Sequence, residues 1–343
     1  MEYRRLGRTG VSVSSLCLGT MMFGEWGTKD HDESVRIIHR AMDAGINFID
    51  TADYYSHGES EVIVGKALAG ARRDDVVLAS KVHFPMGEDP NHRGNSRRWI
   101  IREVEDSLRR LGTEWIDLYQ IHRYDPDTDI DETLGALTDL VRAGKVRYIG
   151  HSTWPASAIV EAQWTARDRG RERFVSEQPP YSIFVRGIEA DVLPTCQRYG
   201  MGVIPWSPLA GGFLAGGYRT ETEAAGPFSP ARRRLAGNRF DLSLPGNQRK
   251  LDAAGQLAEL ADKAGMTLIE MAIAFVIRHP AVTSAIIGPR TMEHLGSQLS
   301  GADVKLSDDV LDRIDEIVPP GTTVNPADNG WVSPALDPKA RRR

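Results

Sequence analysis

The stretch INFIDTADYYSHGESEVIVGKALAGARRDDVVLASK, residues 46–81, holds two short apolar runs separated by a helix-like segment. The runs INFID and VVLASK are typical of buried strands, and the segment from Ser60 to Leu68 is typical of a helix. Each run ends on a charged residue, Asp50 in the first and Lys81 in the second. This order predicts two parallel strands whose carboxyl ends lie at the same edge of a sheet.

The same pattern continues along the chain, at intervals of mostly about 30 to 40 residues, the size of one βα unit. Because parallel strands that alternate with helices put all their carboxyl ends on one face, the pattern predicts an enzyme of the α/β class on a (β/α)₈ barrel. In all, seven strand-like runs close on a residue suited to chemistry or ligand contact: Asp50, Lys81, His122, Ser152, Gln178, Trp206–Ser207 and Gly288–Arg290.

The length of the chain fits one decorated barrel, since a (β/α)₈ barrel needs about 250 residues. We therefore expect one domain over residues 1–343, in which the first eighteen residues form a hairpin turned at Arg8–Gly10. Two loop insertions are expected at about 84–97 and 209–247, and loops this long are usually functional. From residue 319 onward we expect an irregular tail, with Trp331 packed over the site.

Composition excludes several classes of protein. The net charge of −5 gives no basic footprint for nucleic acid. Two cysteines are too few for a disulfide framework, no apolar run reaches the length of a membrane span, and no leader is evident, so we expect a cytoplasmic protein. HExxH and paired CxxC motifs are absent, and no metal site is expected.

Four polar residues near successive strand ends can be combined into one mechanism without a metal: Asp50, Tyr55, Lys81 and His122. An ammonium beside a phenol lowers the pKa of the phenol, so Lys81 would make Tyr55 a usable acid near neutral pH. Asp50 can supply the counter-ion that a buried ammonium needs, and a neutral His122 imidazole can donate to a carbonyl oxygen. Together they would protonate an oxyanion as it forms, which carbonyl reduction by hydride requires.

Taken singly, each of these residues has a structural explanation as well. A Lys–Asp pair is often a structural ion pair, a loop tyrosine is often packing, and a lone histidine is often a satisfied core residue. Their joint placement favours the functional interpretation. Hydride chemistry needs a cofactor, but G-x-G-x-x-G does not occur in the chain. A nicotinamide would therefore bind through the loops of the barrel.

Several motifs, in order along the chain, resemble the aldo-keto reductase superfamily, from Glu2 to about Leu306. These are INFIDTADYYSHGESEVIVGKAL, ASK around Lys81, DLYQIH around His122, GKVRYIGHS, and IPWSPLAGGFLAG. The chain most resembles the bacterial branch related to channel β-subunits and to reductases of sugars and xenobiotic carbonyls. The resemblance implies a TIM barrel that binds NADPH across its C-terminal face, with Asp50, Tyr55, Lys81 and His122 as the catalytic tetrad and Tyr55 as the general acid.

The resemblance also implies a set of cofactor contacts. Ser152 and Gln178 would hold the nicotinamide carboxamide, and Trp206 would stack on the nicotinamide ring. A guanidinium at Arg290 suits a 2′-phosphate, which favours NADPH over NADH. The alternative is that Arg290 is simply a solvated residue at the start of a helix. Thr153 departs from the family pattern, in which asparagine usually follows the serine. The pyrophosphate would pass Ser207, Leu209 and Gly211. The adenosine end would lie along Gly288, Arg290 and Gln298.

The substrate pocket would be built from loops over the barrel mouth, and aromatic walls suit flat carbonyl compounds and sugar faces alike. Arg123 indicates a polar or anionic substituent, but a surface ion pair explains it equally well. The candidate residues are Phe23, Trp26, Tyr54, His83, Phe84, Arg123, Tyr124, Trp154 and Trp331.

The expected partner is a small-molecule carbonyl substrate, with neither nucleic acid nor membrane involved. Two other functions stay open: a specialised reductase of keto-sugars or secondary metabolites, and a cofactor-binding partner subunit with little turnover. A homo-oligomer is compatible with the sequence, which leaves the oligomeric state open.

Overall fold

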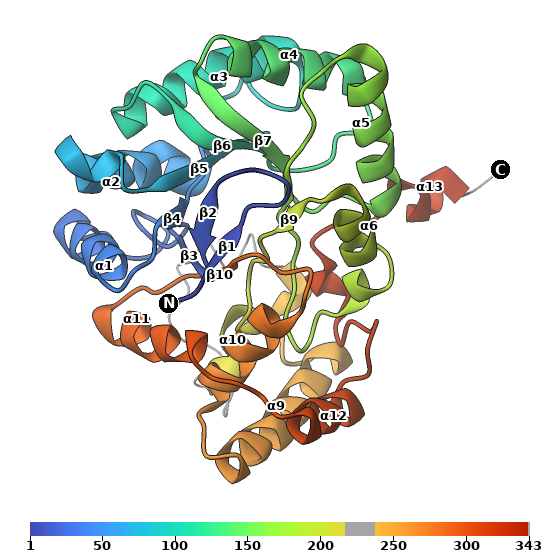
Figure 1. Ribbon diagram of the computed structural model, residues 1–343. Coiled ribbons are helices and arrows are strands. Elements are labelled where there is room, and N and C mark those ends of the chain that lie inside the picture. Colours follow the sequence, from blue (N-terminus) through green and yellow to red (C-terminus); the bar gives the residue numbers. More distant parts are fainter. Residues whose placement is uncertain (217–236, 342–343) are drawn as a thin grey trace.

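The computed structural model describes residues 1–216 and 237–341, and its centre is a sheet of eight parallel strands. Neighbours in the sheet follow the chain, except that the last strand, β10, lies beside the first, β3. Figure 1 views the sheet along the axis around which it curls. The strands are β3 (Leu16–Gly19), β4 (Phe48–Asp50), β5 (Val77–Val82), β6 (Ile116–Ile121), β7 (Val146–His151), β8 (Ser176–Glu177), β9 (Gly202–Val203) and β10 (Ala285–Ile287).

Backbone hydrogen bonds also join the two ends of this series. The amide of Thr283 donates to the carbonyl of Val203 at 2.8 Å, and the amide of Ile286 donates to the carbonyl of Pro205 at 2.8 Å. The segment leading into β10 thus contacts both β3 and the end of β9. The curled parallel sheet confirms the expected (β/α)₈ barrel architecture.

The amino-terminal hairpin is present but shorter than expected. Its strands β1 (Tyr3–Arg5) and β2 (Ser12–Ser14) pair antiparallel. The prediction that the hairpin takes all of the first eighteen residues is wrong, because Leu16–Gly19 forms β3, the first barrel strand. The run VSVSSLCLG contains no turn residue between the two strands, so the sequence carries no signal of the boundary. Seven of the eight barrel strands were therefore identified from the sequence, and β3 was the one missed.

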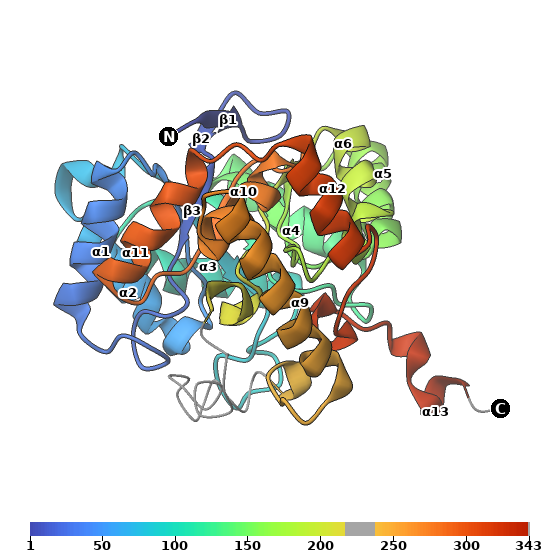
Figure 2. The same ribbon diagram turned by 90° about the horizontal axis from the view of Figure 1, so that it is seen from below.

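Most of the helices surround the barrel as an outer ring and turn an apolar face inward (Figures 1 and 2). In α1, for example, Ile37, Ile38 and Ala41 are buried, and the Asp30 carboxylate caps the first turn. The helices are α1 (His31–Asp43), α2 (Glu59–Leu68), α3 (Arg97–Leu111), α4 (Ile130–Arg142), α5 (Ala156–Arg169), α6 (Val192–Tyr199), α9 (Pro245–Lys263), α10 (Leu268–Arg278), α11 (Met292–Leu299), α12 (Asp308–Ile317) and α13 (Pro338–Arg341).

The inside of the barrel has an apolar floor beneath a polar layer. Phe48, Ala79 and Leu118 belong to a buried cluster that Leu6 and Val13 of the hairpin region complete. Successive side chains of a strand alternate between its two faces, so the residue two positions further along points the same way. On these three strands that residue is Asp50, Lys81 and Gln120, each buried. The alternation thus places polar groups together at the C-terminal end of the barrel.

The two expected insertions and the tail differ in how far the structure describes them. Residues 83–96 connect β5 to α3 without a helix or strand. Of the insertion at 209–247, residues 217–236 lie outside the described part; the remainder forms short 3₁₀ turns and the start of α9 at Pro245. The tail is not wholly irregular, because it contains two 3₁₀ turns and α13, which projects from the barrel in Figures 1 and 2. Among the described helices, none is long and apolar enough to cross a membrane.

Candidate active site

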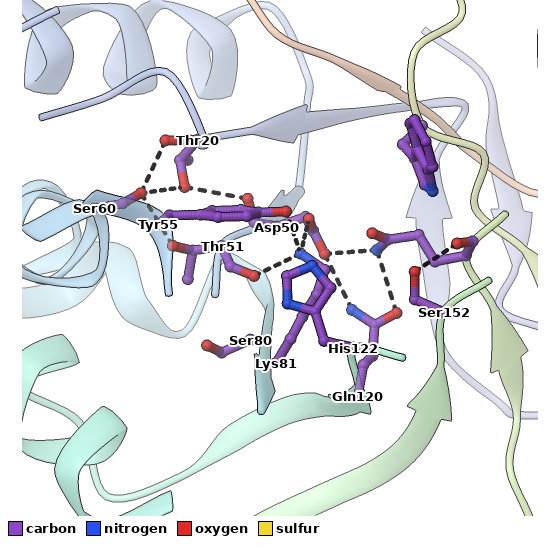
Figure 3. Close-up of polar contacts among 12 residues, drawn as sticks. Thr20, Asp50, Thr51, Tyr55, Ser60, Ser80, Lys81, Gln120, His122 and Ser152 are labelled. Atoms are coloured by element: carbon purple, nitrogen blue, oxygen red, sulfur yellow. Dashed lines mark hydrogen bonds and ion pairs between the residues drawn. The ribbon is translucent and has the colours of Figure 1, made fainter. Parts of the chain in front are cut away.

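Three of the four predicted catalytic side chains are joined by direct contacts at the C-terminal end of the barrel (Figure 3). The Lys81 ammonium donates to Asp50 Oδ1 at 2.5 Å, to the Thr51 carbonyl at 2.7 Å and to the Tyr55 hydroxyl at 3.0 Å. Lys81 and Asp50 are buried, while Tyr55 is partly buried. The ammonium therefore has three oxygen acceptors, which fills its donor capacity.

The fourth residue, His122, lies beside Tyr55, with ring centroids 5.7 Å apart in an edge-on arrangement. Burial, with smaller contributions from Lys81 and Arg123, holds the pKa of His122 well below its ordinary value of 6.5. The imidazole is consequently neutral at pH 7 and keeps one N–H. Its Nδ1 atom has no hydrogen-bond partner in the described part of the chain. A neutral donor beside the phenol agrees with the arrangement expected from the sequence.

The net shift of Tyr55 is opposite to the expected one. Lys81 does act to lower the pKa of Tyr55, as predicted, but desolvation by burial is the largest effect and raises it, and Asp50 adds to the rise. The net pKa therefore lies above the ordinary value of 10.0. Burial also acts to lower the pKa of Lys81, but Asp50 and Tyr55 outweigh it, so that pKa is raised. At neutral pH the pair consists of a phenol and an ammonium.

A further amide network surrounds Asp50 on its other side. Gln178 Nε2 donates to Asp50 Oδ2 at 2.8 Å, and Gln120 Nε2 donates to the same oxygen at 3.1 Å. Ser152 Oγ donates to the Gln178 carbonyl at 2.7 Å. Ser152 and Gln178, predicted to hold a carboxamide, thus lie together and next to the tetrad. Gln120 was not predicted, although its place two residues before His122 puts both on the inward face of β6.

Unusual backbone conformation is concentrated in the loops at this face. Among the described residues, five other than glycine have a positive φ, between 48° and 59°. Each lies close in sequence to a predicted site residue, and such strained conformations are retained mainly at functional sites. Ser56 and His57 follow Tyr55, Thr153 follows Ser152, and Ser207 and Ala210 flank Leu209.

Trp206 lies in the segment that follows β9 and is partly exposed. Its Nε1–H donates to Thr153 Oγ1 at 3.4 Å, and the Arg239 guanidinium lies 5.4 Å from the ring centroid. Gly330 approaches the same ring so closely that an added Cβ would be 2.9 Å from it. The tail therefore reaches this site through Gly330, whereas the placement of Trp331 over the site stays a prediction.

The residues predicted along the pyrophosphate and adenosine occupy two other loops. Leu209 and Gly211 belong to the glycine-rich loop after Trp206, where Gly211 has φ 68° and lies against Phe240. Gly288 has open space around the position of a Cβ, and the Arg290 carbonyl accepts from Thr28 Oγ1 at 2.9 Å. Gln298 is buried in α11, and its Oε1 has no hydrogen-bond partner in the described part of the chain.

The substrate-pocket candidates divide into groups. An aromatic wall, made of Trp26, Tyr54 and Phe84, leads to His122, with successive ring centroids 5.2, 4.9 and 4.8 Å apart. His83 contacts Phe84, with centroids 5.3 Å apart. Phe23, by contrast, is fully buried in the core and cannot line a pocket. Tyr124 and Trp154 line a hollow of about 360 Å³ together with Asn95 and the start of α4.

Comparisons with known proteins agree with this architecture. The model of the aldo/keto reductase family matches residues 15–319. YrpG of Bacillus subtilis, named an uncharacterized oxidoreductase, is 38% identical over 342 residues, which cover 96% of this chain and 100% of that protein. A putative voltage-gated potassium channel subunit beta of Schizosaccharomyces pombe is 35% identical, covering 93% of each chain. Versiconal hemiacetal acetate reductase of Aspergillus parasiticus is 34% identical, covering 92% of this chain and 96% of that protein.

The alignments cover nearly the full length of each relative and of this chain. The resemblance that the motifs indicated is therefore confirmed. The match of the family model over most of the barrel and the oxidoreductase-named relatives support carbonyl reduction with a nicotinamide cofactor in general terms. This protein belongs to the aldo/keto reductase family and is an NAD(P)H-dependent oxidoreductase.

Proposed function

We propose that this protein reduces an aldehyde or a ketone to an alcohol with NADPH, and that Tyr55 donates the proton. The observation that supports this most strongly is the 3.0 Å contact between the Tyr55 hydroxyl and the Lys81 ammonium. A carbonyl oxygen becomes an oxyanion as hydride reaches the carbon, and it then needs a proton and a hydrogen-bond donor. A protonated phenol beside a neutral imidazole supplies both.

Each member of the tetrad has a distinct task in this proposal. The remaining N–H of His122 donates to the carbonyl oxygen and orients it toward Tyr55, which transfers its proton to that oxygen. The Lys81 ammonium stabilises the phenolate that is left, because the two groups are already in contact. Asp50 fixes the ammonium and balances its charge in the buried site.

The residues present fit a nicotinamide dinucleotide. NADPH supplies the hydride when it is bound. Ser152 and Gln178 would hold the carboxamide, and the exposed part of the Trp206 ring offers a flat face for the nicotinamide. Leu209 and Gly211, with Ser207, would pass the pyrophosphate, since positive-φ loops present backbone N–H groups to anions. The open space at Gly288, and a Gln298 Oε1 without a hydrogen-bond partner among the described residues, suit a group lying along α11.

NADPH is favoured over NADH because of Arg290, which stands two residues before α11 begins. A guanidinium binds a phosphate monoester through two parallel hydrogen bonds, and NADH has no 2′-phosphate to receive them.

The experiment is to follow NADPH absorbance with a panel of aromatic, aliphatic and sugar carbonyl compounds and to identify the product. Formation of one alcohol per NADPH consumed is expected. NADPH binding without turnover on any member would contradict a general reductase. It would instead favour a cofactor-binding partner subunit; one relative is named as a putative channel subunit. Turnover confined to keto-sugars would identify the specialised reductase.

A further inference from the structure

Arg123 is a cation placed at the edge of the predicted reaction centre. It follows His122 directly at the end of β6, and its Nη1 donates to the His122 carbonyl at 2.6 Å. The same Nη1 lies 3.5 Å from Ser152 Oγ, and the guanidinium carbon lies 5.5 Å from the centroid of the Phe84 ring. The guanidinium is therefore held between the tetrad, the predicted carboxamide site and the aromatic wall.

This arginine has no carboxylate partner within residues 1–216 and 237–341. The nearby Asp125 accepts instead from the Asp127 amide and the Thr128 hydroxyl. Two other arginines removed from solvent are paired with carboxylates: the partly buried Arg110 contacts two of them, and so does the buried Arg186. The surface ion pair that the sequence left open as an explanation of Arg123 is thus not formed in the described chain.

The environment of Arg123 is costly for an unpaired cation. Burial lowers the pKa of its guanidinium, an effect that Tyr55 and Glu177 offset only in part. A guanidinium has five N–H donors, and those on Nε and Nη2 have no acceptor in the part of the chain that the structure describes. Arg123 is partly buried, and charges removed from water are normally paired, so an arginine kept in this state suits a ligand that supplies the anion.

The aromatic wall indicates what the rest of that ligand resembles. Trp26, Tyr54 and Phe84 form a continuous row of ring contacts that ends at His122, and the Arg123 guanidinium lies over the Phe84 ring. Such a row packs well against a flat, apolar body. A carbonyl oxygen at Tyr55 and His122 would leave the far end of the body free to reach the guanidinium.

We propose that the substrate of this protein is a flat carbonyl compound that carries an oxyanion group, a carboxylate or a phosphate monoester, and that Arg123 binds this group. The inference rests on the proposed carbonyl reduction for the identity of the reacting group. It concerns a further specificity residue, and the role of Arg123 does not require it to transfer a proton.

The kinetic test compares para-carboxybenzaldehyde and para-formylphenyl phosphate with the neutral methyl ester of the first compound. For the wild type, kcat/KM is expected to be at least about tenfold higher for one of the anions than for the ester. Arg123→Met should remove that preference and leave the ester nearly unaffected, while Arg123→Lys, which keeps the charge, should retain part of it. The matched control is Arg167→Met, because Arg167 is exposed on α5 and contacts Trp164.

A binding test separates this inference from the proposed reductase activity. The affinities of the corresponding alcohols, para-(hydroxymethyl)benzoate, its phosphate analogue and the neutral methyl ester, are measured by calorimetry on the complex with NADPH, in which no turnover occurs. A preference for an anion that Arg123→Met abolishes supports the inference even if no aldehyde is reduced. The better of the two anions then identifies the group. Equal affinities in the wild type, or a preference that survives in Arg123→Met, would overturn it. A third outcome would also overturn it: Arg123→Met binds NADPH more weakly and loses affinity for the acid and the ester equally. Arg123 would then serve the cofactor.

Discussion

The ammonium of Lys81 lies 3.0 Å from the hydroxyl of Tyr55, inside a site where burial raises the pKa of that hydroxyl. The two effects oppose each other, and the desolvation of the phenol is the larger. Tyr55 is therefore protonated at neutral pH, as a proton donor must be, while Lys81 is positioned to stabilise the phenolate that forms when the proton leaves.

Replacement of Lys81 by methionine should both inactivate and destabilise the protein. Asp50 is buried, and without the ammonium its carboxylate keeps, among the described residues, the amides of Gln120 and Gln178 as donors. Breaking a buried ion pair on one side typically costs about 3 to 5 kcal/mol in the free energy of unfolding. Urea unfolding measures this directly.

The matched control is Lys145→Met, which removes a partly exposed lysine that pairs with Glu105 and should change stability by less than about 1 kcal/mol. Adding Asp50→Asn to Lys81→Met should recover part of the lost stability, since the uncompensated charge is then gone. If Lys81→Met were as stable as the control, the buried pair would not have the energetic role assigned to it.

The pH profile should differ between the two directions of the reaction. Reduction needs protonated Tyr55, whose pKa is raised above 10.0, so kcat/KM for reduction should be flat through neutral pH and fall only above that value. Oxidation of an alcohol needs the phenolate, so its rate should rise with pH.

The acidic side of the profile tests His122. Because its pKa lies well below 6.5, it stays neutral there and should cause no loss of reduction near pH 6.5. A decline of kcat/KM centred near that pH, absent in His122→Gln, would show that the imidazole titrates normally.

Glu177 should prove important for holding the predicted carboxamide site. Its carboxylate, fully buried, accepts from His151 Nδ1 and from the Trp154 amide at 3.2 Å. These contacts tie together the ends of β7 and β8, where Ser152 and Gln178 follow directly in the chain. Glu177→Leu leaves two buried donors without an acceptor, at a cost of about 1 to 3 kcal/mol each.

We expect Glu177→Leu to lower the unfolding midpoint and to weaken NADPH binding, and Glu177→Gln, which keeps an acceptor oxygen, to restore part of both. Fluorescence titration with NADPH and thermal unfolding provide the two readouts. Loss of stability with unchanged NADPH affinity would limit Glu177 to a structural role.

Arg290→Ala should weaken the binding of NADPH more than that of NADH. Hydrogen bonds to a charged group contribute about 1.5 to 3 kcal/mol, so the affinity for NADPH should fall by roughly 10- to 150-fold. Dissociation constants of the two coenzymes for wild type and variant give the comparison. Equal losses would mean that Arg290 does not read the 2′-phosphate.

Much of the fold could be predicted, because strand and helix periodicity and polar strand ends are local features of a sequence. The positions of Asp50, Lys81 and His122 at successive strand ends follow directly from them. The boundary between β2 and β3 could not be predicted, since one extended run without a turn residue serves two different sheets. Only the pairing partners, which lie far away in the chain, distinguish the two strands.

The electrostatics of the site depended on packing that local patterns do not contain. The sequence indicated that Lys81 would act on Tyr55, and it does, but the extent of burial decides the sign of the net pKa shift. Likewise, the two explanations of Arg123 could be separated only once the positions of all neighbouring carboxylates were known. Gln120 could have been predicted from strand alternation alone, as the inward neighbour of His122.

The central claim is that Tyr55 is the proton donor, and a single-turnover measurement on Tyr55→Phe tests it most directly. Phenylalanine keeps the ring that lies beside His122 and removes only the hydroxyl. The account predicts that the rate of NADPH oxidation by a bound carbonyl compound falls by about 10²- to 10⁴-fold, with the dissociation constant of NADPH changed by no more than about twofold. A rate in Tyr55→Phe close to that of the wild type would contradict it.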